Sequence, residues 1–274
     1  MKIIVTGGSS GIGKGTAAAL AAAGHQVVIA ARTPAKAEQA AAEMAGDVEI
    51  ADLDLADLGS VRKFADSVDT VDVLINNAGV MGLPLTRTPD GFETLFGTNY
   101  LGHFALTCLL GDKIANRVVS VVSMHHVFGR VDLDDLNWRT REYKKWAAYG
   151  QSKLALMLFT SELARRGVHA LAADPGGADT SIVRYETGFL KWSSGLSWLN
   201  DFPQSAQTAA QSSVLAATAD LPSGAYVAPR FRQWGKPRVT RAVKKARDPV
   251  TARRLWQISA ELTGCDWQGP SRTR

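Results

Sequence analysis

The sequence has 274 residues, of which 46% are hydrophobic and 21% are charged, a balance that fits one large globular α/β domain better than two small ones. Its apolar runs fall far short of the roughly 20 residues that span a membrane, and Cys108 and Cys265 form neither a disulfide framework nor a metal-ligand spacing. The net charge of +5 owes much to basic residues from position 230 onward. They could form a nucleic-acid or anionic-membrane surface, or a solvated face beside an anionic cofactor.

We favour the solvated face, and so expect no nucleic-acid partner, because no nucleic-acid-binding motif accompanies the charge. Two cysteines without a framework indicate a reducing compartment. An apolar strand is expected from residue 2 onward, so neither a signal nor a transit peptide is expected. The sequence therefore predicts a cytoplasmic protein without a transmembrane segment.

Apolar, strand-like segments alternate along the chain with helical ones. The first half predicts, in order, a strand over 2–6, a loop over 7–13 opening a helix to 23, a strand over 27–31, a helix over 34–45, a strand over 48–51 and a helix over 58–67. The next segments predict a strand over 72–76, a long helix within 90–110, a strand over 117–123, a helix from about 149 to 166 and a strand over 168–173. Unbroken apolar strands favour a parallel sheet with helices on both faces, whose binding crevice lies at the carboxyl ends of the strands.

Gly7, Gly11 and Gly13 lie between the first strand and the first helix. Glycine lets the backbone approach a ligand closely, and a helix N-terminus offers free N–H groups and a positive dipole end to a pyrophosphate. A tight strand-to-helix turn without a ligand is the alternative. The strand before and the helix after favour dinucleotide binding.

The end of the second strand bears on the choice of dinucleotide. An NAD enzyme would place Asp or Glu there for the ribose 2′-hydroxyl, whereas this chain has Ala31 followed by Arg32. A guanidinium matches a phosphate, so NADP (NADPH) is preferred over NAD, with a solvated Arg32 as the alternative. Asp54, after the third strand, could accept a hydrogen bond from the adenine amino group or could cap the helix that begins near Asp57.

Tyr149 and Lys153 are four residues apart on a predicted helix, so their side chains are neighbours. An ammonium beside a phenol favours the phenolate, which predicts a pKa for Tyr149 below its reference value of about 10. Tyr149 is thus a candidate proton donor or acceptor. Of the five tyrosines, only Tyr149 has a lysine four residues on.

Several short motifs follow one another at the predicted strand ends and in the helices between them. They are Thr6-Gly-x-x-x-Gly11-x-Gly13, Asn76-Asn77-Ala78-Gly79, Asn99, Ser123, Tyr149-x-x-x-Lys153 and Pro175-Gly176. As a set, over about residues 1–230, they resemble the short-chain dehydrogenase/reductase family. Three further segments are similar to its branch of retinol-dehydrogenase-like and WW-domain-oxidoreductase-like proteins: Ala30-Ala31-Arg32, Leu53-Asp54-Leu55 with Ser60-Val61-Arg62, and Leu255-Trp256-Gln257-Ile258-Ser259.

The resemblance implies one Rossmann-fold domain over residues 1–274, doubly wound, with a substrate lid over about 182–205 and a basic C-terminal extension over about 230–274. It implies that Tyr149 exchanges a proton with the substrate oxygen, Lys153 lowers the Tyr149 pKa, Ser123 holds that oxygen and Asn99 anchors a water. The implied cofactor-binding residues are Gly7, Ser9, Ser10, Gly11, Ile12, Gly13, Arg32, Asp54, Leu55, Asn77, Ala78, Gly79, Tyr149, Lys153, Pro175, Gly176 and Thr180.

Some residues depart from the family pattern. Ser123 and Tyr149 are 26 positions apart, about twice the usual spacing, and the segment between them resembles an insertion of the retinol-type branch. Asp174 stands where the family usually keeps a neutral residue, so it could pair with a nearby base or weaken the binding of an anionic cofactor. For His125 and His126, close to Ser123, we expect structural hydrogen bonding rather than catalysis.

The lid segment is rich in apolar and aromatic residues, which implies a hydrophobic alcohol, aldehyde or ketone as substrate. Packing of the lid on itself or on another subunit is the alternative, and the resemblance also implies a possible homodimer or homotetramer. The leading hypothesis is an NADP-dependent oxidoreductase of EC class 1.1.1. The alternatives are reduction of a C=C bond by the same pair, a non-catalytic NADP-sensing protein on this fold, and a nucleic-acid binder with steeply salt-dependent binding.

Overall fold

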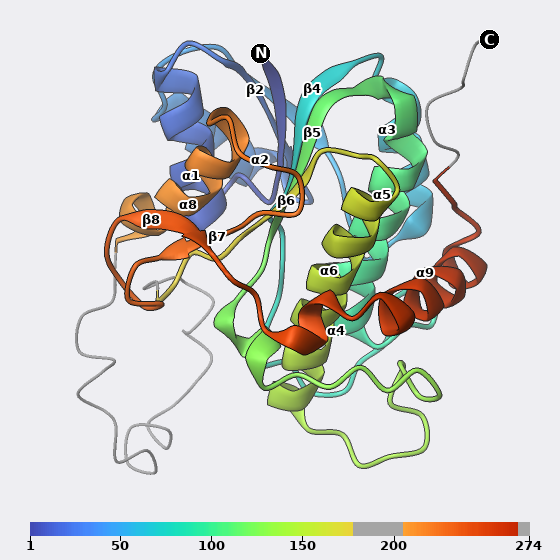
Figure 1. Cartoon of the computed structure of the whole chain (residues 1–274). Coiled ribbons are helices and arrows are strands. Elements are labelled where there is room, and N and C mark those ends of the chain that lie inside the picture. Colours follow the sequence, from blue (N-terminus) through green and yellow to red (C-terminus); the bar gives the residue numbers. More distant parts are fainter. Residues whose placement is uncertain (178–204, 268–274) are drawn as a thin grey trace, which may run out of the picture.

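One mixed sheet organises the computed structural model, which describes residues 1–177 and 205–267 (Figure 1). In these residues eight strands lie in the order β3-β2-β1-β4-β5-β6-β7-β8. All neighbouring strands pair in parallel except β8, which is antiparallel to β7. The strands are β1 (Lys2–Thr6), β2 (Gln26–Ala31), β3 (Val48–Asp52), β4 (Val71–Asn76), β5 (Ile114–Val121), β6 (Ala170–Ala173), β7 (Tyr226–Pro229) and β8 (Pro237–Thr240).

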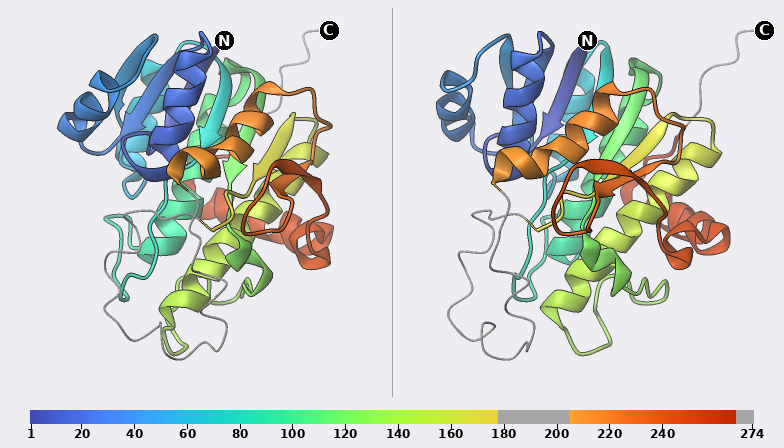
Figure 2. Two further views of the ribbon diagram at one scale, coloured as in Figure 1. Left: turned by 90° about the vertical axis from the view of Figure 1, so that its left-hand side faces the viewer. Right: turned by 60° about the vertical axis from the view of Figure 1, so that its left-hand side comes forward.

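Helices cover both faces of the sheet (Figures 1 and 2). On one face, α1 (Gly11–Ala22), α2 (Pro34–Ala42) and α8 (Ala206–Thr218) contribute to a hydrophobic core with alternate residues of the central strands. The other face carries the larger core, built from α3 (Leu58–Ser67), α5 (Gly102–Leu110), α6 (Lys145–Arg165) and α9 (Pro249–Thr263). The central strands are buried on both faces, which explains their unbroken apolar runs. The predicted doubly wound Rossmann architecture is confirmed.

The edge beyond β6 differs from the expectation of a wholly parallel sheet, which is wrong there. β7 and β8 were not predicted, because each has only four residues and each contains a proline. Pro229 and Pro237 lie opposite each other at one end of the antiparallel pair. Proline removes a ladder N–H and is typical of sheet edges, so a sequence pattern gives little sign of such strands.

The long helix expected within residues 90–110 is interrupted. It begins as α4 (Thr94–Phe96), continues as a π-helical turn (Gly97–Leu101) and then becomes α5 (Gly102–Leu110). The Glu93 side chain caps α4 by accepting hydrogen bonds from the N–H groups of Leu95 and Phe96, at 2.9 and 2.7 Å. A π turn places a helical residue out of its usual register and often marks a functional position. Asn99 lies within it.

Three short 3₁₀ turns complete the described secondary structure: Gly111–Lys113, Met124–Val127 and Lys244–Arg247. The second of them directly follows Ser123, whose hydroxyl accepts a hydrogen bond from the His125 N–H at 3.3 Å. In residues 1–177 and 205–267, no helix combines the length and apolarity that crossing a membrane requires.

Helix α9 packs against α5 and α6 through Trp256, which is buried. The indole ring stacks on Phe159 at a centroid distance of 5.5 Å and meets Phe104 edge-on at 5.0 Å. The Arg166 guanidinium lies 4.0 Å above the same ring, and the indole N–H donates to Asp266 at 2.7 Å. The C-terminal helix is therefore part of the main core rather than an appendage.

Candidate active site

The predicted site residues that the structure describes lie along the edge of the sheet where β1 to β6 end, or on the helices beside that edge. The loop after β1 leads into α1, whose N-cap residue Ser10 makes no side-chain capping bond, and the first turn of α1 holds no acidic residue. The first N–H groups of α1 therefore remain available to an anion. A Cβ on Gly13 would collide with the Gly7 carbonyl oxygen and the Asn77 amide nitrogen, so the loop packs closely on the turn after β4.

Thr6 ties the ends of β1 and β4 together. Its hydroxyl accepts hydrogen bonds from the N–H groups of Asn77 and Ala78 at 2.9 and 3.0 Å, while the Asn77 side chain donates to the Thr6 carbonyl at 2.7 Å. The same hydroxyl lies 2.9 Å from Nε2 of His103. Two of the predicted cofactor-binding residues, Asn77 and Ala78, are thus held against the glycine loop.

Asn99 fixes the rest of that turn. Its side-chain oxygen accepts from the Val80 N–H at 2.8 Å, and its amide donates to the Val80 carbonyl and the Ser152 hydroxyl at 2.9 and 3.0 Å. Its backbone carbonyl lies 3.0 Å from Nδ1 of His103. The side chain is therefore used to position residues 78–80 and helix α6, and the water expected at Asn99 stays a prediction.

Tyr149 lies in a small aromatic setting near the start of α6. Its ring meets His125 edge-on at 5.1 Å and Trp146 at 6.3 Å, and His125 stacks on Trp146 at 5.7 Å. The Ser123 hydroxyl interacts with the Tyr149 phenol and lies 3.2 Å from Nδ1 of His125. The structure thus brings Ser123 and Tyr149 together across the 26 positions that separate them in sequence.

Lys153 reaches from α6 toward the end of β5, where Nζ donates to the Val121 carbonyl at 3.0 Å. Nζ is 5.9 Å from the centroid of the Tyr149 ring, and a Cβ on Gly79 would lie 3.5 Å from it. The side chain is almost completely buried. Tyr149 and Lys153 are therefore neighbours, as the helical spacing predicted, and the turn at Gly79 lies beside Lys153.

The expected direction of the Tyr149 pKa is not the one found for this chain. Burial, helped by the nearby Asp174 and opposed by Ser123, raises the pKa of Tyr149 to about 12. Burial likewise lowers the pKa of Lys153 to about 8, against the opposing effect of Asp174. Removing the phenol from water is the largest effect on the Tyr149 pKa, and Lys153, whose Nζ is bonded to Val121, is not among the groups that lower it.

Of the remaining predicted cofactor residues, the structure describes all but Thr180. Arg32 is exposed at the end of β2, and Leu55 is buried below the turn that holds Asp54. Asp57, not Asp54, caps α3 by accepting from the Gly59 N–H at 2.7 Å, which excludes the capping alternative for Asp54. Asp54 instead accepts from the Ala56 N–H at 2.9 Å.

Two further predicted cofactor residues, Pro175 and Gly176, follow β6. Thr180 and the predicted lid, apart from residue 205, lie outside the described residues.

The insertion between Ser123 and Tyr149 is organised around Asp135, whose carboxylate accepts hydrogen bonds from Arg139, Thr140 and Arg141. The Arg141 guanidinium lies 3.6 Å above the Trp138 ring and donates to Gln151 of α6 at 2.6 Å. The insertion thereby brings apolar side chains to Tyr149. We call this group the Tyr149 cluster: Val80, Met81, Leu83, Leu95, Trp138, Tyr143, Trp146, Ala148 and Tyr149.

Sequence reasoning assigned no site role to Thr6, His103 or Ser152. His103 is buried and bonded at both ring nitrogens, and burial lowers its pKa to about 4, so it acts as a neutral connector between Thr6 and Asn99. Its position four residues after Asn99 on a predicted helix was an available signal. Nothing in the local sequence indicated the contacts of Thr6 or Ser152, since their partners are far away in the chain.

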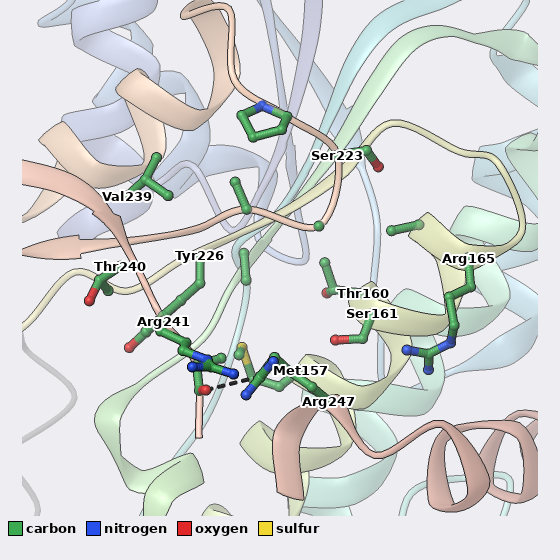
Figure 3. Close-up of a pocket in the computed structure, with 16 residues that line it drawn as sticks. Met157, Thr160, Ser161, Arg165, Ser223, Tyr226, Val239, Thr240, Arg241 and Arg247 are labelled. Atoms are coloured by element: carbon green, nitrogen blue, oxygen red, sulfur yellow. Dashed lines mark hydrogen bonds between the residues drawn. The ribbon is translucent and has the colours of Figure 1, made fainter. Parts of the chain in front are cut away.

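A cavity of about 620 Å³ lies elsewhere, between the C-terminal half of α6 and the β7–β8 edge (Figure 3). Met157, Thr160 and Ser161 line it from α6, and Arg241 and Arg247 from the segment after β8. None of the predicted catalytic residues lines this cavity. Its location therefore does not identify the candidate site, which rests on the convergence of side chains at the strand ends.

Comparison with known proteins finds a family model, curated relatives and a solved structure that are similar to this chain. Residues 1–188 match the family model described as short chain dehydrogenase. The chain is 43% identical to retinol dehydrogenase 13 of Homo sapiens, over 96% of this chain and 85% of the relative. It is 40% identical to retinol dehydrogenase 12 of Mus musculus, over 97% of this chain and 87% of the relative. The crystal structure of an uncharacterised protein from Mycobacterium paratuberculosis superposes with a TM-score of 0.84 at 44% identity, covering 97% of this chain and 94% of that one.

Proposed function

This chain belongs to the short-chain dehydrogenase/reductase family, and from that premise we propose an NADP-dependent oxidoreductase that interconverts a hydrophobic alcohol and its aldehyde or ketone. Oxidoreduction between an alcohol and a carbonyl follows from the family and from relatives named retinol dehydrogenases. The proposal adds NADP, the role of Tyr149 and the hydrophobic substrate class.

The single observation that carries the proposal is the convergence of Ser123, Tyr149 and Lys153 beside the turn at Gly79. In the reducing direction Tyr149 donates a proton to the substrate oxygen, and the Ser123 hydroxyl holds that oxygen as negative charge develops on it. Lys153 supplies the positive charge that stabilises the tyrosinate left behind. A nicotinamide cofactor bound along the glycine loop would supply or accept the hydride at the substrate carbon.

The hydrophobic substrate class is supported by the Tyr149 cluster. Trp146, Val80, Met81 and Leu83 are only partly buried, so they offer apolar surface around the phenol. Sites for small molecules are mainly apolar with a few fixed polar groups, and here Ser123 and Tyr149 are such groups. A lipophilic carbonyl compound fits this setting better than a sugar or a small acid.

The proposed preference for NADP over NAD rests on Arg32. It is exposed at the carboxyl end of β2, where the ribose 2′-position is expected, and neighbouring residues 33–36 carry no acidic side chain. We expect Arg32→Ala to weaken NADPH binding by roughly tenfold to a hundredfold, the worth of a charge-assisted hydrogen bond, and to leave NADH binding nearly unchanged.

The measurement is the dissociation constant of each dinucleotide from fluorescence titration of the wild type and the variant. Lys36→Ala, which removes a neighbouring exposed cation on α2, is the matched control for a general change in surface charge. If Arg32→Ala weakened the binding of NADPH and NADH equally, Arg32 would not contact the 2′-phosphate.

A panel of retinal, long-chain aldehydes, steroid ketones and quinones tests the activity itself, with NADPH oxidation as the signal. The non-catalytic NADP sensor is the competing function, because a fold alone does not establish catalysis. Turnover that depends on Tyr149 would support the oxidoreductase. NADPH binding without turnover of any substrate would favour the sensor.

A further inference from the structure

Asp174 is a buried acidic residue directly after β6, next to the proposed reaction centre. Its side chain is 1% exposed. One carboxylate oxygen accepts a hydrogen bond from the Gly176 N–H at 2.9 Å, and the other accepts from the Tyr226 hydroxyl at 2.8 Å. A buried carboxylate is costly unless it is hydrogen-bonded and its charge is compensated. Two hydrogen bonds satisfy its oxygens in part, and the compensating charge remains to be identified.

Strand register brings Lys153 to the same place. Lys153 Nζ donates to the Val121 carbonyl, and Val121 pairs with Ala173, the residue before Asp174. The Val122 N–H donates to the Ala173 carbonyl at 2.9 Å, which carries the pairing to the ends of both strands. Side chains alternate along a strand, and Ala172 faces the core that contains α6, so Asp174 faces that core too. The ammonium and the carboxylate therefore lie on one face of the sheet.

Other ionisable groups surround Asp174 from each element packed against it. From the 3₁₀ turn after Ser123 come His125 and His126, from α6 Tyr149 and Lys153, and from β7 Tyr226. Arg232 and Lys245 affect Asp174 only indirectly. Both lower the pKa of His126, and Arg232 also lowers that of Tyr226.

His126 also acts on the charge of Asp174, and its ring is hydrogen-bonded at one nitrogen only. Nδ1 lies 2.7 Å from the Ser123 carbonyl, as expected for a structural histidine, and the ring meets Tyr226 edge-on at 5.6 Å. Nε2 is buried and has no hydrogen-bond partner among the described residues. Burial lowers the pKa of His126 against the opposing effect of Asp174, so the neutral ring is favoured as the pH rises, and Lys153 is then the cation that remains beside Asp174.

We propose that Asp174 is a positioning residue for the Tyr149–Lys153 pair, whose buried carboxylate keeps the Lys153 ammonium charged while the phenol exchanges its proton. Asp174 touches neither substrate nor cofactor in this role and acts through Lys153. The kinetic consequence rests on the proposed oxidoreductase function, whereas the charge on Lys153 does not.

The sign of the effect follows from the surroundings of each group. Burial lowers the pKa of Lys153 to about 8, and Asp174 raises it. Burial raises the pKa of Asp174 above its usual value, and the hydrogen bonds from Gly176 and Tyr226 and the charges of His126 and Lys153 oppose that rise and so favour the carboxylate. Asp174→Asn keeps the shape and removes the charge, so the pKa of Lys153 falls, and the pKa of Tyr149, which Asp174 raises, falls as well. Both changes move the alkaline limit of carbonyl reduction to lower pH.

The first experiment needs no activity. In the full chain labelled with ¹³C and ¹⁵N in lysine, the Lys153 resonance is assigned from its loss in Lys153→Met and is followed through a pH titration. We expect Asp174→Asn to lower the Lys153 midpoint by on the order of one pH unit, as for loss of a nearby opposite charge. Asp66→Asn, the same change at an exposed position of α3, should leave the midpoint unchanged. An unchanged midpoint in Asp174→Asn would overturn the proposal.

Tyr226→Phe covers the case in which Asp174→Asn does not fold. It removes the hydroxyl that donates to Asp174 and keeps the carboxyl group, so Asp174 takes up a proton more readily and the Lys153 midpoint falls by a smaller amount. A purely structural role for the cluster would lower thermal stability without moving that midpoint, and would also overturn the proposal.

The second experiment measures kcat/KM for NADPH-dependent reduction against pH in the wild type and both variants. We expect the alkaline limit to move to lower pH in the order wild type, Tyr226→Phe, Asp174→Asn, in parallel with the Lys153 midpoints. Absence of turnover in all three proteins would contradict the proposed function and would leave the Lys153 titration as a separate and sufficient test.

Discussion

Replacing Tyr149 with phenylalanine is expected to lower kcat for carbonyl reduction by roughly 10²- to 10⁴-fold, the range of a positioned general acid. The substitution removes one hydroxyl and leaves the ring, so the contacts with His125 and Trp146 remain. The fold and the NADPH dissociation constant should change little. The measurement is steady-state NADPH oxidation, with circular dichroism and cofactor titration on the same preparations.

Tyr100→Phe is the matched control. It makes the same chemical change at a buried tyrosine whose hydroxyl lies 2.8 Å from the Ser259 hydroxyl, outside the candidate site. We expect Tyr100→Phe to cost about 1 kcal/mol of stability and to keep kcat. If Tyr149→Phe retained substantial turnover, another group would have to donate the proton, and His125 would be examined first because it contacts both Ser123 and Tyr149.

The largest expected effect on stability belongs to Trp256→Ala, which should lower the free energy of unfolding by about 3–5 kcal/mol. The variant loses the packing against Phe104 and Phe159 and the contact with Arg166, and it leaves the Asp266 carboxylate without its indole donor. In a chain of this size, that loss corresponds to a melting temperature lower by roughly 10 °C. Chemical denaturation and a thermal melt of the wild type and the variant measure it.

Trp234→Ala provides the comparison for Trp256→Ala, since Trp234 is 42% exposed on the turn between β7 and β8. We expect it to change the free energy of unfolding by less than about 1 kcal/mol. A similar small loss in Trp256→Ala would mean that α9 is dispensable to the core, and the C-terminal segment would then be an extension in the energetic sense.

Local sequence patterns were sufficient to predict the parts of the molecule whose structure is determined by residues close together in the chain. The apolar runs predicted β1 to β6 within a few residues, and the spacing of Tyr149 and Lys153 predicted that their side chains are neighbours. The expected helix over 34–45 ends at Ala42, and the strand expected over 168–173 begins at Ala170. Such differences at element ends reflect competition between local propensity and the turns that follow.

The remaining features depend on partners far apart in the chain. Thr6 meets Asn77 and His103, and Asp174 meets Tyr226, at separations that no local pattern encodes. The Tyr149 pKa could not be given the right direction from the lysine spacing alone, because burial of the phenol, which raises that pKa, is a property of the assembled core. The proposed cofactor contacts, the lid and the oligomeric state stay predictions.

The antiparallel pair β7–β8 at one end of the sheet also disfavours pairing with a strand from another copy of the protein. An outermost strand exposes backbone groups that can recruit a strand from another chain and start aggregation. In β8 the first residue, Pro237, has no N–H to offer, and the next, Arg238, places an exposed positive charge on the strand. At four residues the strand is also too short to serve as a good template. The β8 edge of the sheet is therefore poorly suited to pairing with a strand from another chain.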